Sequence, residues 1–404
     1  MLDDDHGSPH PTDLSEEAIA LHAERRGKIA VESTWELRTR KDLSLAYTPG
    51  VGAVCMEIAR DPRRVFDLTC KRNMVAVVTD GSAVLGLGNI GPEAALPVME
   101  GKAILFKTFA GVDAFPICLA TQDTGEIVQA VRHIAPVFGG INLEDIAAPR
   151  CFDVEERLRD IGIPVFHDDQ HGTAIVVMAA LLNALKVTGK KLDELTVVFN
   201  GSGASALACT RLLVDCGRKQ LCPPPKDVIL CDSKGIIHRG RTDLNAHKSA
   251  IAAITNRRQL TGGLRDALVG ADVFIGLSQA KLVDGAMVRS MAPNPIVFAM
   301  ANPVPEIMPD EARTAGAVVV GSGRSDFPNQ INNVLAFPGV FRGALDAGAT
   351  VINEPMKIAA AFALADYVIE PTPERVLPDP LEREVVAHIA HAVANAAREA
   401  QVCR

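Results

Sequence analysis

The fold class follows from eleven residues near the middle of the chain, Thr196-Val197-Val198-Phe199-Asn200-Gly201-Ser202-Gly203-Ala204-Ser205-Ala206. The first five form a β-branched, apolar run that is typical of a buried strand. The last six are a G-x-G-x-x-A pattern that opens an alanine-rich helix. In this pattern the first glycine makes a tight turn, the second lets backbone amides approach a pyrophosphate, and the small last residue allows close helix–sheet packing. We therefore predict a dinucleotide site at residues 201–206; the alternative is a glycine-rich turn without a ligand.

Strands and helices alternate on both sides of this segment. Short apolar runs predict further strands at residues 75–79, 117–120, 163–167, 228–231, 273–276 and 296–300. Apolar residues at helical spacing predict helices at residues 14–22, 94–109, 123–135 and 173–188. This alternation predicts an α/β fold with a doubly wound parallel sheet. We expect residues 1–14 to be a loose tail and residues 340–404 to be helices that pack back on the body.

Charge and apolar patterning exclude several classes of partner. The 404 residues include 41 Lys and Arg against 49 Asp and Glu, a formal net charge of −8. This balance disfavours nucleic acid and anionic membrane surfaces as partners. The longest apolar run, residues 174–182, is about half as long as a bilayer span. We therefore predict no nucleic-acid binding and no membrane-spanning segment.

The N-terminus and the cysteines predict a cytoplasmic protein. The first ten residues are acidic and contain no apolar stretch, unlike a secretory signal. None of the nine cysteines forms a Cys-x-x-Cys pair, and the tightest spacing is between Cys216 and Cys222. We expect neither a zinc site nor a disulfide framework, so reduced thiols are the simplest interpretation.

Asp232 ends the strand that follows the glycine-rich turn. An acidic residue there normally accepts the ribose 2′-hydroxyl of NAD and repels the 2′-phosphate of NADP. Its neighbours Ser233 and Lys234 would instead offer a phosphate a donor and a positive charge. The pattern favours NAD slightly, and a strand-end turn without a ligand is the alternative.

Two acidic pairs, Glu144-Asp145 and Asp168-Asp169, stand at predicted strand ends. Carboxylates of this kind suit a hard divalent cation, which takes oxygen ligands from a few side chains and completes its shell with water and substrate. Either pair taken alone is also compatible with a solvated turn.

Two further residues have chemistry that the fold does not require. Lys102 lies in the otherwise apolar stretch 101–106, and burial would lower its pKa and suit it to act as a general base. A surface lysine with a buried stem is the alternative. Tyr47 is one of two tyrosines and precedes Thr48-Pro49-Gly50, where a packed turn residue is the alternative.

Several long blocks of sequence, in colinear order over residues 15–350, resemble the malic enzymes, in particular the compact bacterial kind. The matching stretches are LSLAYTPGV at 43–51, TDGS at 79–82, LGLGNIG at 85–91, GKA at 101–103, FHDDQHGTA at 166–174, DSKG at 232–235, NP at 302–303 and NNV at 332–334. The resemblance implies oxidative decarboxylation of L-malate to pyruvate and CO2, with NAD or NADP and with Mg2+ or Mn2+. It also implies a homodimer or a dimer of dimers.

The resemblance assigns roles to individual residues. It makes Lys102 the general base, Tyr47 the general acid and Asp168 a catalytic residue that orients the lysine. The implied metal ligands are Glu144, Asp145 and Asp169; the implied cofactor contacts are residues 201–206, Asp232 and Asn302; and the implied substrate contacts are Asn332 and Asn333.

The chain departs from the larger eukaryotic members at one position. Those members carry a carboxylate-binding arginine shortly after the Thr-Asp-Gly block, where this chain has Ala83. We expect Arg72 to be a candidate replacement. By the same resemblance, residues 1–170 form the catalytic malic domain and residues 171–404 the Rossmann-type domain with its C-terminal helices, and the active site lies between the two domains.

Two other functions remain open at this stage. A malolactic-type enzyme would keep its NAD and release lactate, and net cofactor reduction would distinguish it. A non-catalytic metabolite sensor would use the same scaffold, but a sensor does not need to retain Tyr47, Lys102, Asp168 and the metal ligands.

Overall fold

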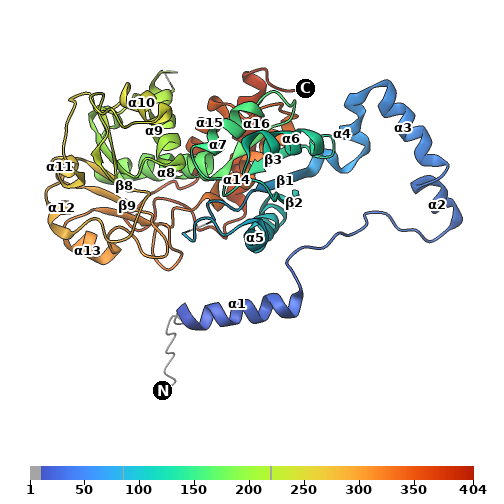
Figure 1. Cartoon of the computed structure of the whole chain (residues 1–404), viewed down its shortest axis with the longest axis horizontal. Helices are drawn as coiled ribbons and strands as arrows, with labels where there is room; N and C mark the ends of the chain where they lie inside the picture. The colour runs from blue at the N-terminus through green and yellow to red at the C-terminus, as the bar shows by residue number, and fades with distance from the viewer. Residues whose placement is uncertain (1–10, 85, 219–220) are drawn as a thin grey trace.

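The computed structural model describes residues 11–84, 86–218 and 221–404. These residues form two mainly parallel sheets with helices around them, and an N-terminal arm, residues 11–60, whose helices extend away from the body (Figure 1). The arm contacts the body where Lys28 Nζ donates to the Pro97 carbonyl oxygen. Most of the predicted tail lies outside the described residues, and the first helix, α1 (Pro11–Arg25), begins earlier than predicted.

The first sheet has the strand order β2-β1-β3-β4, with all neighbours parallel. Its strands are β1 (Met74–Thr79), β2 (Asp113–Cys118), β3 (Gly140–Leu143) and β4 (Val165–His167), and its helices are α5 (Pro92–Ala110), α6 (Thr124–Ile134) and α7 (Arg150–Arg157). β2 begins four residues before the predicted strand and contains Pro116, which is tolerated because β2 is an edge strand.

The second sheet has the order β10-β9-β8-β5-β6-β7. Its strands are β5 (Thr196–Asn200), β6 (Asp227–Asp232), β7 (Gly235–Ile236), β8 (Val273–Gly276), β9 (Ile296–Ala299) and β10 (Val319–Ser322). Only β7 is antiparallel to its neighbour. The chain order reverses at β5, which pairs with both β6 and β8. A reversal of this kind creates a crevice at the carboxyl ends of the strands, and it confirms the predicted doubly wound domain.

Helix α8 (Asp168–Thr188) leads from the first sheet to the second. By length and composition it could span a bilayer, but 67% of its apolar window is buried inside the protein. It packs against α9 (Ala204–Arg218) and α15 (Glu354–Asp366), so we interpret it as a core helix. The predicted domain boundary at residue 170 falls inside α8 and stays a prediction.

The C-terminal helices return to the first sheet. α14 (Phe337–Ala347) packs against α16 (Glu384–Glu399) and α5, and α15 packs against α8. Phe337 and Phe341 of α14 contact Phe106 of α5 with ring centroids 4.7 and 5.2 Å apart. This packing confirms that the C-terminal helices fold back on the body.

The remaining helices are short or belong to the arm. They are α2 (Arg40–Ala46), α3 (Gly50–Arg60), η1 (Pro62–Arg64), α4 (Val65–Leu68), η2 (Cys70–Asn73), η3 (Leu192–Glu194), α10 (Ala246–Ala252), α11 (Leu264–Leu268), α12 (Gly285–Arg289), α13 (Pro309–Thr314) and η4 (Asn333–Leu335). α2 and α3 contain no buried residue. The expectation of reduced thiols is corrected at one pair, because Cys216 and Cys222 are joined by a disulfide.

Candidate active site

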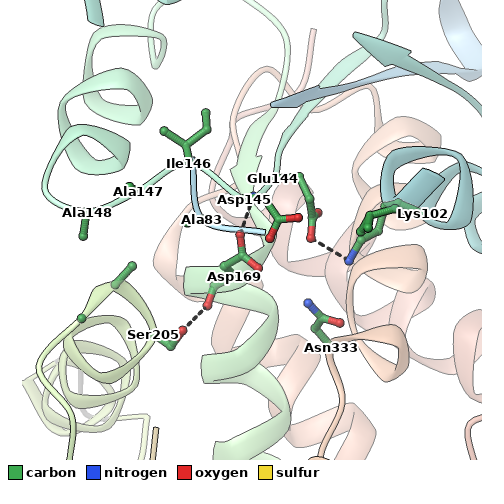
Figure 2. A pocket seen from close by; sticks show the side chains of 13 residues that line it. Ala83, Lys102, Glu144, Asp145, Ile146, Ala147, Ala148, Asp169, Ser205 and Asn333 are labelled. Carbon is green, nitrogen blue, oxygen red and sulfur yellow. Dashed lines mark hydrogen bonds and ion pairs between the residues drawn. The ribbon is translucent and has the colours of Figure 1, made fainter. Parts of the chain in front are cut away.

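Three of the predicted metal ligands meet at one point. Glu144 and Asp145 directly follow β3, and Asp169 lies in the first turn of α8. Their ligand oxygens all lie within 4.8 Å of one another. Asp145 has a left-handed backbone, with φ of 54°, and its N–H donates to Asp169 Oδ2 at 2.8 Å (Figure 2). The carboxyl ends of the strands therefore bring together two acidic pairs that are 24 residues apart in sequence.

Lys102 points from α5 into the same cluster (Figure 2). Its Nζ lies 2.6 Å from Asp168 Oδ2 and 3.0 Å from Glu144 Oε1, and it sits 4.4 Å from the ring centroid of Phe337. Burial acts to lower the pKa of Lys102, but Asp168 and Glu144 outweigh it, and the pKa is raised. The prediction that burial makes this lysine readily deprotonated is thus wrong for the protein alone, because two carboxylates lie within 3.0 Å.

The cluster carries more negative than positive charge. Burial raises the pKa of Glu144 well above its ordinary value, despite the opposing effect of Lys102. Burial likewise raises the pKa of Asp168 to about 6. Four carboxylates, those of Glu144, Asp145, Asp168 and Asp169, share one lysine. A divalent cation is the ligand that this set of buried oxygen donors fits.

The glycine-rich turn lies beside the carboxylates. Gly203, Ala204 and Ser205 line the same cavity of about 450 Å³ as Lys102 and the three acidic ligands. Gly201 has φ of 117°, and a Cβ there would lie 2.7 Å from the carbonyl oxygen of Leu277. Only glycine fits this turn without strain. Ser202 lies between Gly201 and Gly203. Ala206 is buried in the first turn of α9, where its small side chain allows the close packing that the pattern predicts.

Asp232 is held by two cations that the sequence did not single out. Arg241 Nη1 donates to one carboxylate oxygen at 2.8 Å, and Lys248 Nζ donates to the other at 2.8 Å. Burial alone would raise the pKa of Asp232, but these bonds hold it below its ordinary value. Lys234 pairs with Asp243 instead. In the sequence, these partners are visible only as an arginine and a lysine that lie 9 and 16 residues after Asp232.

The predicted asparagines take different positions. Asn333 lines the cavity opposite Lys102 (Figure 2). Asn332 Oδ1 accepts a hydrogen bond from the N–H of Val334 at 3.0 Å, so this side chain caps η4. Asn302 follows β9 and is exposed. Its carbonyl oxygen lies close to Gly86, in the segment between β1 and α5.

Two predicted residues lie outside this cluster in a single copy of the chain. Tyr47 ends α2 on the arm, and it is 66% exposed. Arg72 is exposed just before β1, whereas the acidic cluster lies at the carboxyl ends of the strands. The six residues of β1 put about 20 Å between the two ends. Arg72 therefore does not join the cluster within one copy of the chain, and its role as a substrate contact stays a prediction.

Arg150 was missed from the sequence. Its Nε donates to Asp80 Oδ2 at 3.1 Å and its Nη2 donates to Ser82 Oγ at 2.9 Å. Asp80 is 1% exposed, so the guanidinium compensates a buried carboxylate. These bonds brace the loop that carries Ala83 to the cavity wall.

A doubly wound dinucleotide fold that opens onto a buried lysine–carboxylate centre is typical of nicotinamide-dependent oxidoreductases. The malic enzyme N-terminal domain matches residues 26–159, and the malic enzyme NAD binding domain matches residues 170–398. The chain belongs to the malic enzyme family, which confirms the resemblance found in its sequence.

Individual relatives are similar over nearly the whole chain. The bifunctional malic/malolactic enzyme of Bacillus subtilis is 58% identical over 97% of this chain and 95% of its own length. The NADP-dependent malic enzyme of Halomonas elongata is 48% identical over 96% of this chain and 94% of its own length. The crystal structure of an NAD-dependent malic enzyme from Thermotoga maritima superposes with a TM-score of 0.89, at 48% identity, over 93% of this chain and 98% of that one.

Proposed function

We propose that this chain oxidatively decarboxylates L-malate to pyruvate and CO2, reduces NAD or NADP, and depends on Mg2+ or Mn2+. One observation carries the proposal. Lys102, the three clustered carboxylates and the glycine-rich turn line a single cavity, and Asp168 holds Lys102 from behind the cavity wall. A hydroxy acid in that cavity would meet a proton acceptor, a cation site and a hydride acceptor together.

Glu144, Asp145 and Asp169 would hold the cation, since their oxygens already converge. A bound Mg2+ or Mn2+ would polarise the substrate oxygens and offset the carboxylate charge that keeps Lys102 protonated. Lys102 would accept the C2 hydroxyl proton, and a nicotinamide bound at the glycine-rich turn would supply the hydride acceptor for C2. Asp168 fixes the position of Lys102 Nζ at 2.6 Å. The β-keto acid loses CO2, and the electrons of the broken C3–C4 bond form an enolate that must gain a proton at C3.

For that last step we propose Tyr47 from a second copy of the chain. Tyr47 directly follows α2, which lies away from α5, the helix that carries Lys102 (Figure 1). The arm exposes ten large apolar side chains, which are Ile19, Leu21, Ile29, Val31, Trp35, Leu37, Leu43, Leu45, Tyr47 and Met56. An apolar surface of this kind marks an interface. A two-fold dimer would exchange the arms, so each site would receive its tyrosine from the partner.

The cofactor preference depends on Asp232. We propose that the enzyme uses NAD with modest discrimination against NADP. Asp232 retains a carboxylate at the end of β6, but Arg241 and Lys248 compensate its charge, and this reduces repulsion of a 2′-phosphate. The protein would act in the cytoplasm, where both cofactors are available.

The test is absorbance at 340 nm with L-malate and Mn2+, run in parallel with NAD and NADP, with pyruvate assayed afterwards. Reduced cofactor and pyruvate in equal amounts support the proposal. Lys102→Ala should lose the reaction by orders of magnitude while NADH still binds, as measured by fluorescence. Near-normal turnover of that variant would exclude Lys102 as the base.

A second candidate is the malolactic reaction, favoured by the name of the Bacillus subtilis relative. That reaction returns the hydride to the three-carbon product, so it gives lactate without net reduction of NAD. Lactate formed from malate, with no change at 340 nm, would support it against the first proposal.

A further inference from the structure

Glu155 of α7 contacts the two residues that directly follow the Asp168-Asp169 pair. Glu155 Oε1 lies 2.6 Å from His171 Nε2, and Glu155 Oε2 accepts a hydrogen bond from Gln170 Nε2 at 3.3 Å. The reaction proposed above assigns no role to Glu155. Its side chain is 14% exposed, so the charge is largely buried and is satisfied by these two partners.

A lysine from the C-terminal region completes the network. Lys357 of α15 is 4% exposed, and its Nζ donates to His171 Nδ1 at 3.1 Å and to Glu354 Oε1 at 2.9 Å. Lys357 Nζ also lies 3.3 Å from His171 Nε2, so the imidazole ring is held between Glu155 on one side and Lys357 on the other. The network joins α7, α8 and α15, three elements that are distant in sequence.

This network acts on the turn of α8 that carries the catalytic carboxylates. An α-helix advances 1.5 Å and 100° per residue, so fixing Gln170 and His171 fixes the rotation of the turn and the direction of Asp168 and Asp169. Phe166 supports the His171 ring from the strand side, with centroids 5.5 Å apart. The residues of this network also line a second cavity of about 430 Å³. Because Glu155 borders this space, a side chain of the same size and shape can replace it without steric overlap.

We propose that Glu155 is a positioning residue that holds the first turn of α8, so that Asp169 faces the other metal ligands and Asp168 faces Lys102. The inference rests on the proposed metal-dependent function. Removing the Glu155 charge, as in Glu155→Gln, would leave one acceptor oxygen for the two donors that Gln170 and His171 present. The turn could then rotate, and the distance from Asp169 to Asp145 would no longer be fixed.

The experiment compares Glu155→Gln with Glu156→Gln, its exposed neighbour on the same helix, which pairs only with Arg159. Mn2+ affinity is measured by titration calorimetry in the absence of malate and cofactor, together with melting temperature, kcat and KM for NAD. We expect Glu155→Gln to weaken Mn2+ binding about tenfold, as changes around metal ligands do, and to lower kcat with KM for NAD unchanged. Glu156→Gln should match the wild type.

Glu155→Ala removes both acceptor oxygens and should weaken Mn2+ binding further. If Glu155→Gln and Glu155→Ala lower only the melting temperature and bind Mn2+ like the wild type, Glu155 is structural and the proposal is overturned. A wild type that binds Mn2+ but does not oxidise malate contradicts the proposed function alone, because the metal titration still tests Glu155. A wild type that fails to bind Mn2+ overturns both.

Discussion

The hydroxyl of Ser205 donates a hydrogen bond to the main-chain carbonyl of Asp169, with 2.8 Å between the oxygens. Ser205 lies in the first turn of α9, immediately after the glycine-rich turn, and Asp169 lies in the first turn of α8. This bond ties the proposed cofactor turn directly to a proposed metal ligand (Figure 2). The two halves of the site therefore share a fixed distance, which hydride transfer requires.

Ser205→Ala tests this connection. Loss of one partly buried hydrogen bond costs about 1 kcal/mol, and we expect kcat/KM for the cofactor to fall about fivefold. Steady-state kinetics with varied NAD measures the effect. Ser290→Ala is the control, since its hydroxyl bonds only to the Met287 carbonyl of α12, and it should not change the kinetics. An unchanged kcat/KM in Ser205→Ala would show that the bond does not contribute to cofactor positioning.

Gly172 leaves room for the Asp168 carboxylate. A Cβ at Gly172 would overlap Asp168 Oδ1 and would lie 3.1 Å from Asn333 Cβ. Gly172→Ala should therefore displace Asp168 from Lys102 and lower kcat at least about 100-fold, as displacements of about 1 Å in an active site do. Gly101→Ala, on the helix that carries Lys102, has no neighbour within 4 Å and should retain activity. Comparable kcat values for the two variants would contradict this explanation.

Asp232→Asn removes the one negative charge that Arg241 and Lys248 share. Lys248 then faces an incoming 2′-phosphate without compensation, while Arg241 keeps its ion pair with Asp243, so kcat/KM with NADP should rise relative to NAD by about tenfold, equivalent to 1.4 kcal/mol. The ratio is measured at 340 nm with both cofactors. Lys248→Met should move the ratio in the opposite direction. A ratio that stays constant in both variants would place the specificity elsewhere.

Stability should depend on pH through Glu155. Burial acts to raise its pKa, but the interaction with His171 outweighs this effect and lowers the pKa to about 2, from 4.5. A depressed carboxyl pKa stabilises the folded state above the unfolded pKa, and this stabilisation is lost as the pH falls through the folded pKa. The difference in free energy of unfolding between wild type and Glu155→Gln should thus shrink by up to about 3 kcal/mol as the pH falls from 5 toward 2. Denaturant titrations at several pH values measure it, and a difference that is constant with pH would contradict this origin.

The parts of the fold that local sequence determines were predictable. Residues 196–206 form the predicted strand, turn and helix because β-branched residues and required glycines act over short distances. The start of α8 was not predictable in this way. Asp168 and Asp169 have the composition of a turn, yet they occupy the first turn of a helix, where their charge complements the helix dipole.

The acidic part of the candidate site was predictable, because the carboxyl ends of neighbouring parallel strands lie at the same edge of a sheet. Glu144, Asp145 and Asp169 were expected to act together on the family resemblance, and they do meet. The protonation of Lys102 was not predictable, because it depends on Asp168, a residue 66 positions away. The position of Tyr47 relative to Lys102 was equally inaccessible, since one copy of the chain does not bring the two residues together.

Subunit complementation tests whether Tyr47 acts on the Lys102 of a partner. Lys102→Ala and Tyr47→Phe should each be inactive as homodimers. Coexpression with two affinity tags yields the hybrid, in which one site combines an intact Lys102 with the partner's intact Tyr47, so about half of the wild-type activity per dimer should return. The reciprocal hybrid, wild type with the double variant, should be inactive because each of its sites lacks one of the two groups. Activity in that reciprocal hybrid, and none in the first, would mean that Tyr47 and Lys102 act within one copy.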